Sequence, residues 1–261
     1  MIGYPPSDVF TRGFQLPTTR ALGIIPARYA SSRFPGKPLA SLSGKPMLQH
    51  VYERAKTARR LEDVWVATDD RRIFDLVAGF GGRAVMTSPD HVCGTDRVAE
   101  AASRPEAAGI DVIVNVQGDQ PLIAADALDR LVGAFDGDPD LGMATLYEPL
   151  TSEADLRDPN VVKVVADRRG DAIYFSRSAI PWSMTGGLDG HLKHVGVYAF
   201  RREYLFEFTR MERGRLEASE SLEQLRVIES GHRIRLVASS GRSISVETPG
   251  DIERVESIIS D

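Results

Sequence analysis

The residues best suited to chemistry in this 261-residue chain lie between positions 26 and 39, where basic and small polar side chains alternate. The segment reads Pro-Ala-Arg-Tyr-Ala-Ser-Ser-Arg-Phe-Pro-Gly-Lys-Pro-Leu, with cations at Arg28, Arg33 and Lys37 and hydroxyls at Ser31 and Ser32. Guanidinium and ammonium groups bind phosphate oxygens through charge-assisted hydrogen bonds. The segment is therefore suited to a polyphosphate, although solvated charges on an ordinary surface loop would give the same pattern.

The neighbouring patterns predict where this loop lies. Residues 22–25 form an apolar run that predicts a buried strand, and we expect the strand to end at Pro26. A helical pattern resumes at Pro46, a residue favoured at the first helical position, with apolar residues from Met47 to Ala55 on one face. The loop is thus expected between the first strand and first helix of an α/β sheet, where nucleotides usually bind. It is not a Walker A loop, because Pro38 follows Lys37.

A second candidate group follows the apolar run at residues 111–116, which is the clearest central-strand pattern in the chain. The run continues into Gln117, Gly118, Asp119 and Gln120. A carboxylate just beyond the end of a buried strand is well placed to hold Mg²⁺. A Gly-Asp turn before Pro121 would explain Asp119 equally well, so these residues alone leave both interpretations open.

Taken together, these segments resemble the sugar-acid cytidylyltransferases. The loop at 26–39 is similar to their CTP-binding signature, and the run at 114–121, Val-Asn-Val-Gln-Gly-Asp-Gln-Pro, is similar to their metal-binding segment. Further similar segments occur in the family's order at 93–100, before the second of these, and at 174–182, 194–198, 222–226 and 246–255, after it. The resemblance extends from about residue 22 to residue 259 and is greatest to the enzymes that act on 3-deoxy-manno-octulosonate (KDO).

This resemblance implies transfer of CMP from CTP to the anomeric hydroxyl of a 3-deoxy-2-ulosonic acid, with release of pyrophosphate. It implies catalytic roles for Arg28, Arg33, Lys37 and Asp119, and CTP contacts from these four residues together with Ser31 and Arg97. It further implies sugar-acid contacts from Gln117, Arg177, His194, Tyr198, Glu223 and Gln224, and Mg²⁺ ligands at Asp119 and Glu247. It also implies a homodimer.

Two positions depart from the family pattern. Gln120 stands where the family has glutamate, and Glu247 stands where it has a metal-binding aspartate. These departures leave a second interpretation open, in which the protein is a paralogue that binds CTP or a sugar acid without turnover. The acceptor is open as well, because the same chemistry could act on an aminated KDO, another sugar acid or a phosphonate.

Composition narrows the class of protein. Charged residues make up 26% and hydrophobic residues 42% of the chain, as in an ordinary globular protein. The net charge of -5 argues against a nucleic-acid partner. The sequence contains no run of ~20 apolar residues, so we expect no membrane span. Cys93 is the single cysteine, which excludes an internal disulfide and favours a reducing, cytoplasmic location. We expect Cys93 to be a bystander thiol, and His191 and His194 lack the second ligand pair of a zinc site.

The element pattern predicts one three-layer α/β nucleotidyltransferase (Rossmann-like) domain over residues 21–261, after a flexible tail at residues 1–20. A β-rich excursion is expected over about 141–200, and it would carry the acceptor pocket and, by the resemblance, much of the dimer contact. We expect Thr95 or Asp96 to cap a helix and one continuous helix over residues 217–229. Strands are expected at 234–238 and 243–246, before a closing helix.

Overall fold

The computed structural model describes residues 19–30, 34–184, 186–240 and 243–259. Its helices are α1 (Met47–Lys56), α2 (Arg71–Gly79), α3 (Gly94–Ala102), α4 (Ala125–Gly133), α5 (Glu153–Arg157), α6 (Arg202–Phe208), α7 (Arg215–Glu220), α8 (Leu225–Glu229) and α9 (Pro249–Ile259). Short 3-10 turns, η1 (Lys37–Leu39) and η2 (Pro105–Ala107), lie between them. The strands are β1 (Ala21–Ala27), β2 (Ser41–Leu42), β3 (Lys45–Pro46), β4 (Leu61–Thr68), β5 (Arg83–Met86), β6 (Val112–Asn115), β7 (Met143–Pro149), β8 (Lys163–Ala166), β9 (Ala172–Ser176), β10 (Leu192–Arg201) and β11 (Ile234–Ala238).

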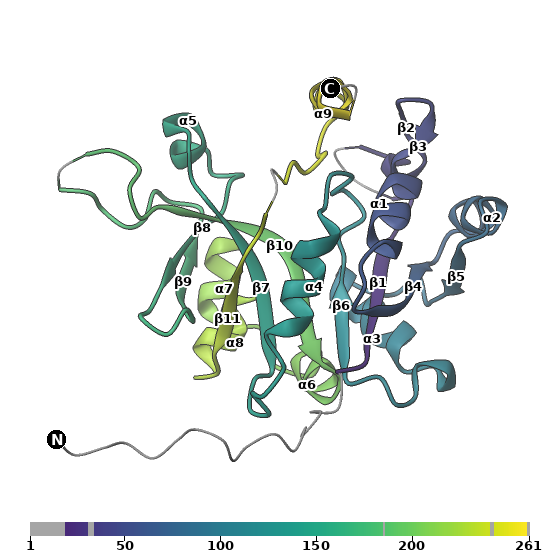
Figure 1. The fold of residues 1–261 in the computed structure, drawn as a ribbon, viewed down its shortest axis with the longest axis horizontal. Coiled ribbons are helices and arrows are strands. Elements are labelled where there is room, and N and C mark those ends of the chain that lie inside the picture. Colours follow the sequence, from purple (N-terminus) through teal and green to yellow (C-terminus); the bar gives the residue numbers. More distant parts are fainter. Residues whose placement is uncertain (1–18, 31–33, 185, 241–242, 260–261) are drawn as a thin grey trace, which may run out of the picture.

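Nine of the strands form one mixed sheet, in which seven have the order β11-β7-β10-β6-β1-β4-β5 (Figure 1), while β2 and β3 pair in a separate two-stranded sheet. β1 pairs in parallel with β4 and β6, whereas β10 is antiparallel to both of its neighbours, β6 and β7. Because β10 runs in the opposite direction, its first half lies beside the carboxyl end of β7. The residues that follow β6 and those that begin β10 therefore meet at one edge of the sheet.

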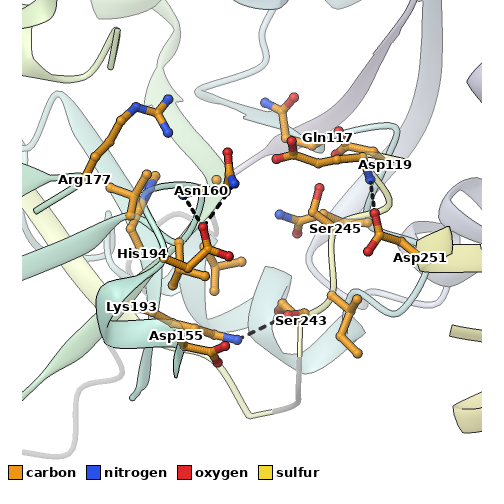
Figure 2. Close-up of a pocket in the computed structure, with 18 of the residues that line it drawn as sticks. Gln117, Asp119, Asp155, Asn160, Arg177, Lys193, His194, Ser243, Ser245 and Asp251 are labelled. Atoms are coloured by element: carbon orange, nitrogen blue, oxygen red, sulfur yellow. Dashed lines mark hydrogen bonds between the residues drawn. The ribbon is translucent and has the colours of Figure 1, made fainter. Parts of the chain in front are cut away.

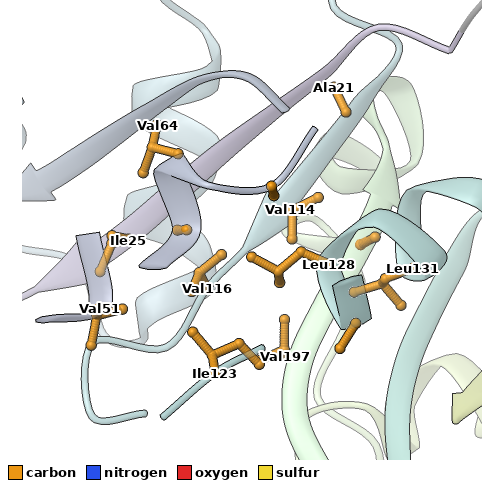
Figure 3. Close-up of a cluster of buried hydrophobic side chains, with 14 of the residues drawn as sticks. Ala21, Ile25, Val51, Val64, Val114, Val116, Ile123, Leu128, Leu131 and Val197 are labelled. Carbon is orange, nitrogen blue, oxygen red and sulfur yellow. The ribbon is translucent and has the colours of Figure 1, made fainter. Parts of the chain in front are cut away.

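Helices cover both faces of this sheet and complete the expected three layers. On one face, α1, α2 and α4 pack against the apolar cluster that contains Ile25, Val114, Val116 and Leu128 (Figure 3). On the other face, α3, α6 and α8 pack against a second cluster around Ile24 and Phe200. Side chains of β1 and β6 point into both clusters, which explains why these strands are mostly apolar.

The β8–β9 hairpin forms the lateral extension of the sheet, where β8 pairs with the start of β10 and the turn of the hairpin forms a bridge to β11. Four strands are expected in a β-rich excursion over about 141–200. Of these, β7 and β10 belong to the central sheet, and only β8 and β9 lie outside its main strand order. Gly170 has φ +82° and makes the expected turn between β8 and β9. Among the helices of the described residues, none has the length and apolar character that a membrane span requires.

Several predicted boundaries are wrong. β1 continues through Pro26 to Ala27. A proline has no N–H to donate, but β6 ends at Asn115, opposite Ile24, so no β6 carbonyl beside Pro26 needs a donor. Pro46 is the N-cap of α1 rather than its first helical residue, and Cys93 caps α3 in place of Thr95 or Asp96. Residues 243–246, predicted as a strand, have no regular secondary structure.

The helix predicted over residues 217–229 is also wrong, because the chain breaks between α7 and α8. Ser221 adopts a left-handed conformation with φ +52°, which stops α7 and turns residues 222–224 away from the helix axis. Most of the predicted tail, residues 1–18, lies outside the described residues. Its last two residues are bound to the body of the protein: Thr19 donates to Asp136, and Arg20 pairs with Glu62.

Candidate functional site

A cavity of about 880 Å³ opens at the edge of the sheet where β6 ends and β10 begins. Its walls come from the segment after β6, the first half of β10, the β8–β9 extension, the link between α7 and α8, and the segment leading into α9. Figure 2 shows Gln117 and Asp119 on one side, facing Arg177, Asn160 and His194 on the other. The cavity thus collects side chains that are far apart in sequence.

Most of the predicted site residues line this one cavity. They are Gln117, Asp119, Arg177, His194, Tyr198, Glu223, Gln224 and Glu247. Ser31 and Arg33 lie outside the described residues, and Arg28 is exposed but does not line the cavity.

Lys37 reaches the same region through Asp119. Gly36 adopts φ +74° and begins the short turn η1, so that Lys37 points back toward the end of β6. The Lys37 ammonium donates to Asp119 Oδ2 at 2.7 Å and to the carbonyl of Val246 at 3.0 Å. This contact joins the loop after β1, the loop after β6 and the segment before α9.

Arg97 is not part of the cavity wall. Its side chain is only 3% exposed and donates to Asp69 Oδ2 at 2.9 Å and to the Thr87 hydroxyl. These contacts hold the carboxyl ends of β4 and β5 to α3. The CTP contact implied for Arg97 stays a prediction.

Glu247 and Asp119 are brought close by the backbone. The amide of Val246 donates to the carbonyl of Asp119 at 2.9 Å, which fixes the segment before α9 against the loop after β6. The amide of Glu247 donates to Asp251 Oδ2 at 3.0 Å, and both residues line the cavity. Carboxylate oxygens suit a hard cation such as Mg²⁺. Within the described ranges, no three His, Cys, Asp or Glu residues form a ready metal-binding group.

The opposite wall is built around His194. Burial lowers the pKa of His194 to about 3, so its ring is neutral at physiological pH. Its Nε2 lies 2.9 Å from the Thr145 hydroxyl, which itself donates to the carbonyl of Val197 at 2.8 Å. Because the hydroxyl proton is used there, Nε2 must carry the ring proton and Nδ1 is left as an acceptor.

Tyr198 and Gln224 continue this wall. The rings of His194 and Tyr198 lie 5.4 Å apart, as expected for residues on one face of a strand, and the Tyr198 hydroxyl donates to Gln224 Oε1 at 3.2 Å. Gln224 is only 1% exposed, and among the described residues its Nε2 has no acceptor. A buried amide without a partner is costly, so this position favours a ligand that brings an oxygen acceptor.

A buried chain of hydrogen bonds connects the two sides of the cavity. Gln117 Nε2 donates to Asn115 Oδ1 at 3.3 Å, and Asn115 Nδ2 donates to Thr95 Oγ1 at 3.3 Å. Thr95 in turn donates to Glu223 Oε1 at 2.6 Å. Burial raises the pKa of Glu223, and the Thr95 hydrogen bond opposes that shift. Thr95, predicted as a helix cap, therefore orients a cavity residue instead.

Sequence reasoning missed other residues of the cavity wall. Lys193 pairs with Glu148 at 2.9 Å and donates to the carbonyl of Ser243 at 3.3 Å. Asp158 and Asn160 lie in the turn between α5 and β8, and Gln120 contributes a buried Oε1 that has no donor among the described residues. Nothing in the local pattern of these polar residues distinguishes them from surface residues, because only the fold brings them to the cavity.

Comparison with known proteins agrees with this geometry. Residues 22–234 match the Cytidylyltransferase family. The chain is 51% identical to the 3-deoxy-manno-octulosonate cytidylyltransferase of Geobacter metallireducens, over 89% of this chain and 94% of the relative. It is 49% identical to the 8-amino-3,8-dideoxy-manno-octulosonate cytidylyltransferase of Shewanella piezotolerans, over 89% and 96%.

Among solved structures, the chain is similar to a CMP:2-keto-3-deoxy-manno-octonic acid synthetase complexed with CTP. The two share 43% identity with a TM-score of 0.86, over 92% of this chain and 98% of the other. A 4-diphosphocytidyl-2C-methyl-D-erythritol synthase from Anaerococcus prevotii, at 12% identity and a TM-score of 0.62, shares the fold. The chain is thus a nucleotidyltransferase by fold and site, and it belongs to the cytidylyltransferase family.

Proposed function

We propose that this protein transfers CMP from CTP to the anomeric hydroxyl of KDO, giving CMP-KDO and pyrophosphate. The observation that carries the proposal is the one cavity that His194, Tyr198, Gln224 and Asp119 all line, with His194 and Asp119 on opposite sides of it (Figure 2). One wall offers neutral hydrogen-bonding groups for a hydroxylated sugar, and the other joins the basic loop that suits a triphosphate. The names of the relatives support the choice of CTP and KDO.

The reaction joins the anomeric oxygen to the α-phosphorus of CTP, while the bond from that phosphorus to the pyrophosphate oxygen breaks and the hydroxyl proton passes to solvent. Two anions, the triphosphate and the sugar carboxylate, must approach each other. Lys37 offsets phosphate charge, as would Arg28 and Arg33, and Arg177 and Lys193 add positive charge on the sugar side. The neutral His194 ring orients sugar hydroxyls through its Nδ1 without adding charge.

Mg²⁺ is proposed as the cofactor. Asp119 and Glu247 would hold it, because both line the cavity and the backbone bond from Val246 to Asp119 keeps their segments together. When bound, Mg²⁺ supplies positive charge that offsets the triphosphate. Lys37, which contacts Asp119 at 2.7 Å, holds that carboxylate in place.

The proposal is tested by pyrophosphate release with CTP and a panel of acceptors: KDO, 8-amino-3,8-dideoxy-manno-octulosonate, a nonulosonic acid and a phosphonate. We expect turnover with KDO and a CMP-KDO product by mass spectrometry. Preference for the 8-amino acid would favour the second candidate, which the Shewanella relatives support. Equal turnover with ATP, or none with any acid, would contradict the proposal, and the latter would favour a non-catalytic paralogue.

The metal proposal is tested by Asp119→Asn and Glu247→Gln, with Asp126→Asn on the exposed start of α4 as the control. We expect Asp119→Asn to abolish almost all turnover and Glu247→Gln to raise the Mg²⁺ concentration needed for half-maximal rate. Mn²⁺ binding, followed by electron paramagnetic resonance in the presence of CTP, should weaken in both variants. If Glu247→Gln kept full activity across a Mg²⁺ titration, Glu247 would have no role in metal binding and would only precede α9.

We further propose that the protein works in the cytoplasm as a homodimer. Trp182 and Met184, in the segment that follows β9, are 85% and 90% exposed, which is unusual for large apolar side chains. A second copy of the chain that covers this segment would bury them. Light scattering should give twice the chain mass, and Trp182→Ser with Met184→Ser should shift the protein toward monomer.

A further inference from the structure

Lys163 is a completely buried lysine at the point where three strands meet. It lies in β8, pairs in register with Ser176 of β9 and with Lys193 of β10, and its side chain is 0% exposed. Its ammonium donates to the backbone carbonyls of Asp158 at 2.9 Å, Val161 at 2.5 Å and Arg177 at 2.7 Å. Among the described residues it forms no ion pair within 4 Å, so backbone oxygens are its direct partners, and the charges of Asp158 and Glu220 act on it from farther away.

The three carbonyls belong to two segments of the cavity wall. Asp158 and Val161 lie in the turn between α5 and β8, while Arg177 directly follows β9. Arg177 closes the same arrangement from the other side, because its Nη1 donates to the carbonyl of Pro159 at 2.8 Å. Lys163 and Arg177 thus both donate to the turn between α5 and β8, and Lys163 also donates to the backbone carbonyl of Arg177.

The turn that they hold faces the cavity. Asp158, Asn160, Val161 and Val162 line it together with Arg177, whereas Lys163 does not. The carbonyl of Val162 accepts from the amide of His194 at 2.8 Å, so the turn is continuous with the His194 wall. Figure 2 shows Asn160 and His194 on this side, across from Gln117.

We propose that Lys163 is a positioning residue for the acceptor: it fixes the turn at 158–162 and Arg177 in the geometry that receives the sugar acid. The inference rests on the proposed function. Three directed hydrogen bonds from one ammonium hold two chain segments at a single point. Without them the carbonyls of Val161 and Arg177 would lose this donor, and that of Asp158 would keep only the Val161 amide. The buried positive charge behind this wall also favours an anionic acceptor. Lys163 itself touches no substrate.

The test measures KM for each substrate in Lys163→Met, which keeps the apolar stem and removes the donors. Arg201→Met is the matched control, because Arg201 also donates to backbone carbonyls, those of Asp138 and Leu141, but lies at the far end of β10. We expect KM for the sugar acid to rise by roughly tenfold or more in Lys163→Met, with KM for CTP unchanged. Arg201→Met should leave both KM values unchanged.

Two further variants separate positioning from general stability. Lys163→Gln keeps two N–H donors, so it should fold and show a smaller rise in the sugar-acid KM than Lys163→Met. Combining Lys163→Met with Arg177→Ala should raise this KM little beyond Arg177→Ala alone, because both changes act on the same wall. A normal sugar-acid KM, or an equal rise in both KM values, would overturn the inference. Absence of turnover in the unaltered protein would instead overturn the proposed function.

Discussion

At the scale of single residues, Lys37 shows how one side chain connects three parts of the site. Its ammonium contacts Asp119 after β6 and the carbonyl of Val246 before α9, and it lies in the loop after β1. A cation at this junction holds the Asp119 carboxylate in place and ties the three segments together. The role of Lys37 in the reaction is therefore open to direct measurement.

Lys37→Ala should lower kcat/KM for CTP by about ten- to a hundredfold, since a hydrogen bond from a charged donor contributes about 1.5–3 kcal/mol. Steady-state pyrophosphate release is the measurement. Lys45→Ala is the control, because Lys45 forms an exposed ion pair with Glu53 and should keep normal kinetics. Unchanged kinetics in Lys37→Ala would make Lys37 a surface charge.

His194 predicts a pH dependence of stability. Its pKa is lowered by burial to about 3, whereas an unfolded histidine titrates near 6.5. Between these two pKa values the unfolded chain binds one more proton than the folded protein. The contribution of His194 to the free energy of unfolding is therefore complete above about pH 6.5 and is lost as the pH falls toward 3. The free energy of unfolding should therefore decrease less steeply from pH 7 to pH 5 in His194→Gln than in the unaltered protein. Urea denaturation at each pH measures the free energy of unfolding. If this free energy fell with pH at the same rate in both proteins, the prediction would be contradicted.

At the scale of elements, the break between α7 and α8 shapes the cavity. Ser221 stops α7, and the following residues Leu222, Glu223 and Gln224 line the cavity instead of continuing a helix. Arg177 reinforces the break, since its Nε donates to the carbonyl of Glu220 at 2.7 Å. A single left-handed residue on the surface thus determines where Glu223 and Gln224 point.

Ser221→Gly and Ser221→Val should change stability in opposite directions. Glycine adopts φ +52° without steric cost, so we expect a gain of up to about 1 kcal/mol, whereas a β-branched residue there should cost about 1–2 kcal/mol. Urea denaturation measures both variants. Because Ser221 is exposed, equal stability of the two would show that the left-handed turn imposes no strain.

At the scale of the whole molecule, the central sheet holds the cavity together. Both faces of β1 and β6 are buried, and the loops that carry Lys37 and Asp119 extend from these two strands. α9 returns to the β2–β3 hairpin near the start of the chain, through a small cluster that contains Leu42, Val246 and Val255 (Figure 1). The last segment of the chain is thereby placed beside the first loop.

Ile25→Ala should destabilise the protein by about 2–5 kcal/mol, because it removes apolar contacts of a completely buried side chain and leaves a cavity in the core. Ile173→Ala is the matched control, since Ile173 is 53% exposed on β9 and should change stability little. Chemical denaturation compares the two. Similar losses in both variants would show that burial of β1 does not dominate stability.

Local patterns in the chain were sufficient to predict the α/β class, the loop after the first strand and the position of Asp119. Those predictions hold because apolar runs and turn residues act over a few positions, and because the carboxyl end of a parallel strand is the usual site for polar function. The helix break at Ser221 was not predictable, since a serine between helical patterns carries no signal for a left-handed conformation. The role of Thr95 was missed for a similar reason, because a helix cap and a buried hydrogen-bond donor look alike in sequence.

Tertiary structure alone decided which polar residues share the cavity. Lys193 and Asn160 lie in segments without a distinctive sequence pattern, and only the antiparallel course of β10 and its pairing with β8 bring those segments to the cavity that Gln117 and Asp119 also line. Burial of Arg97 against Asp69 likewise depends on how α3 packs across the ends of β4 and β5. Such contacts join residues that are distant in sequence, so their energies enter only when the sheet has assembled.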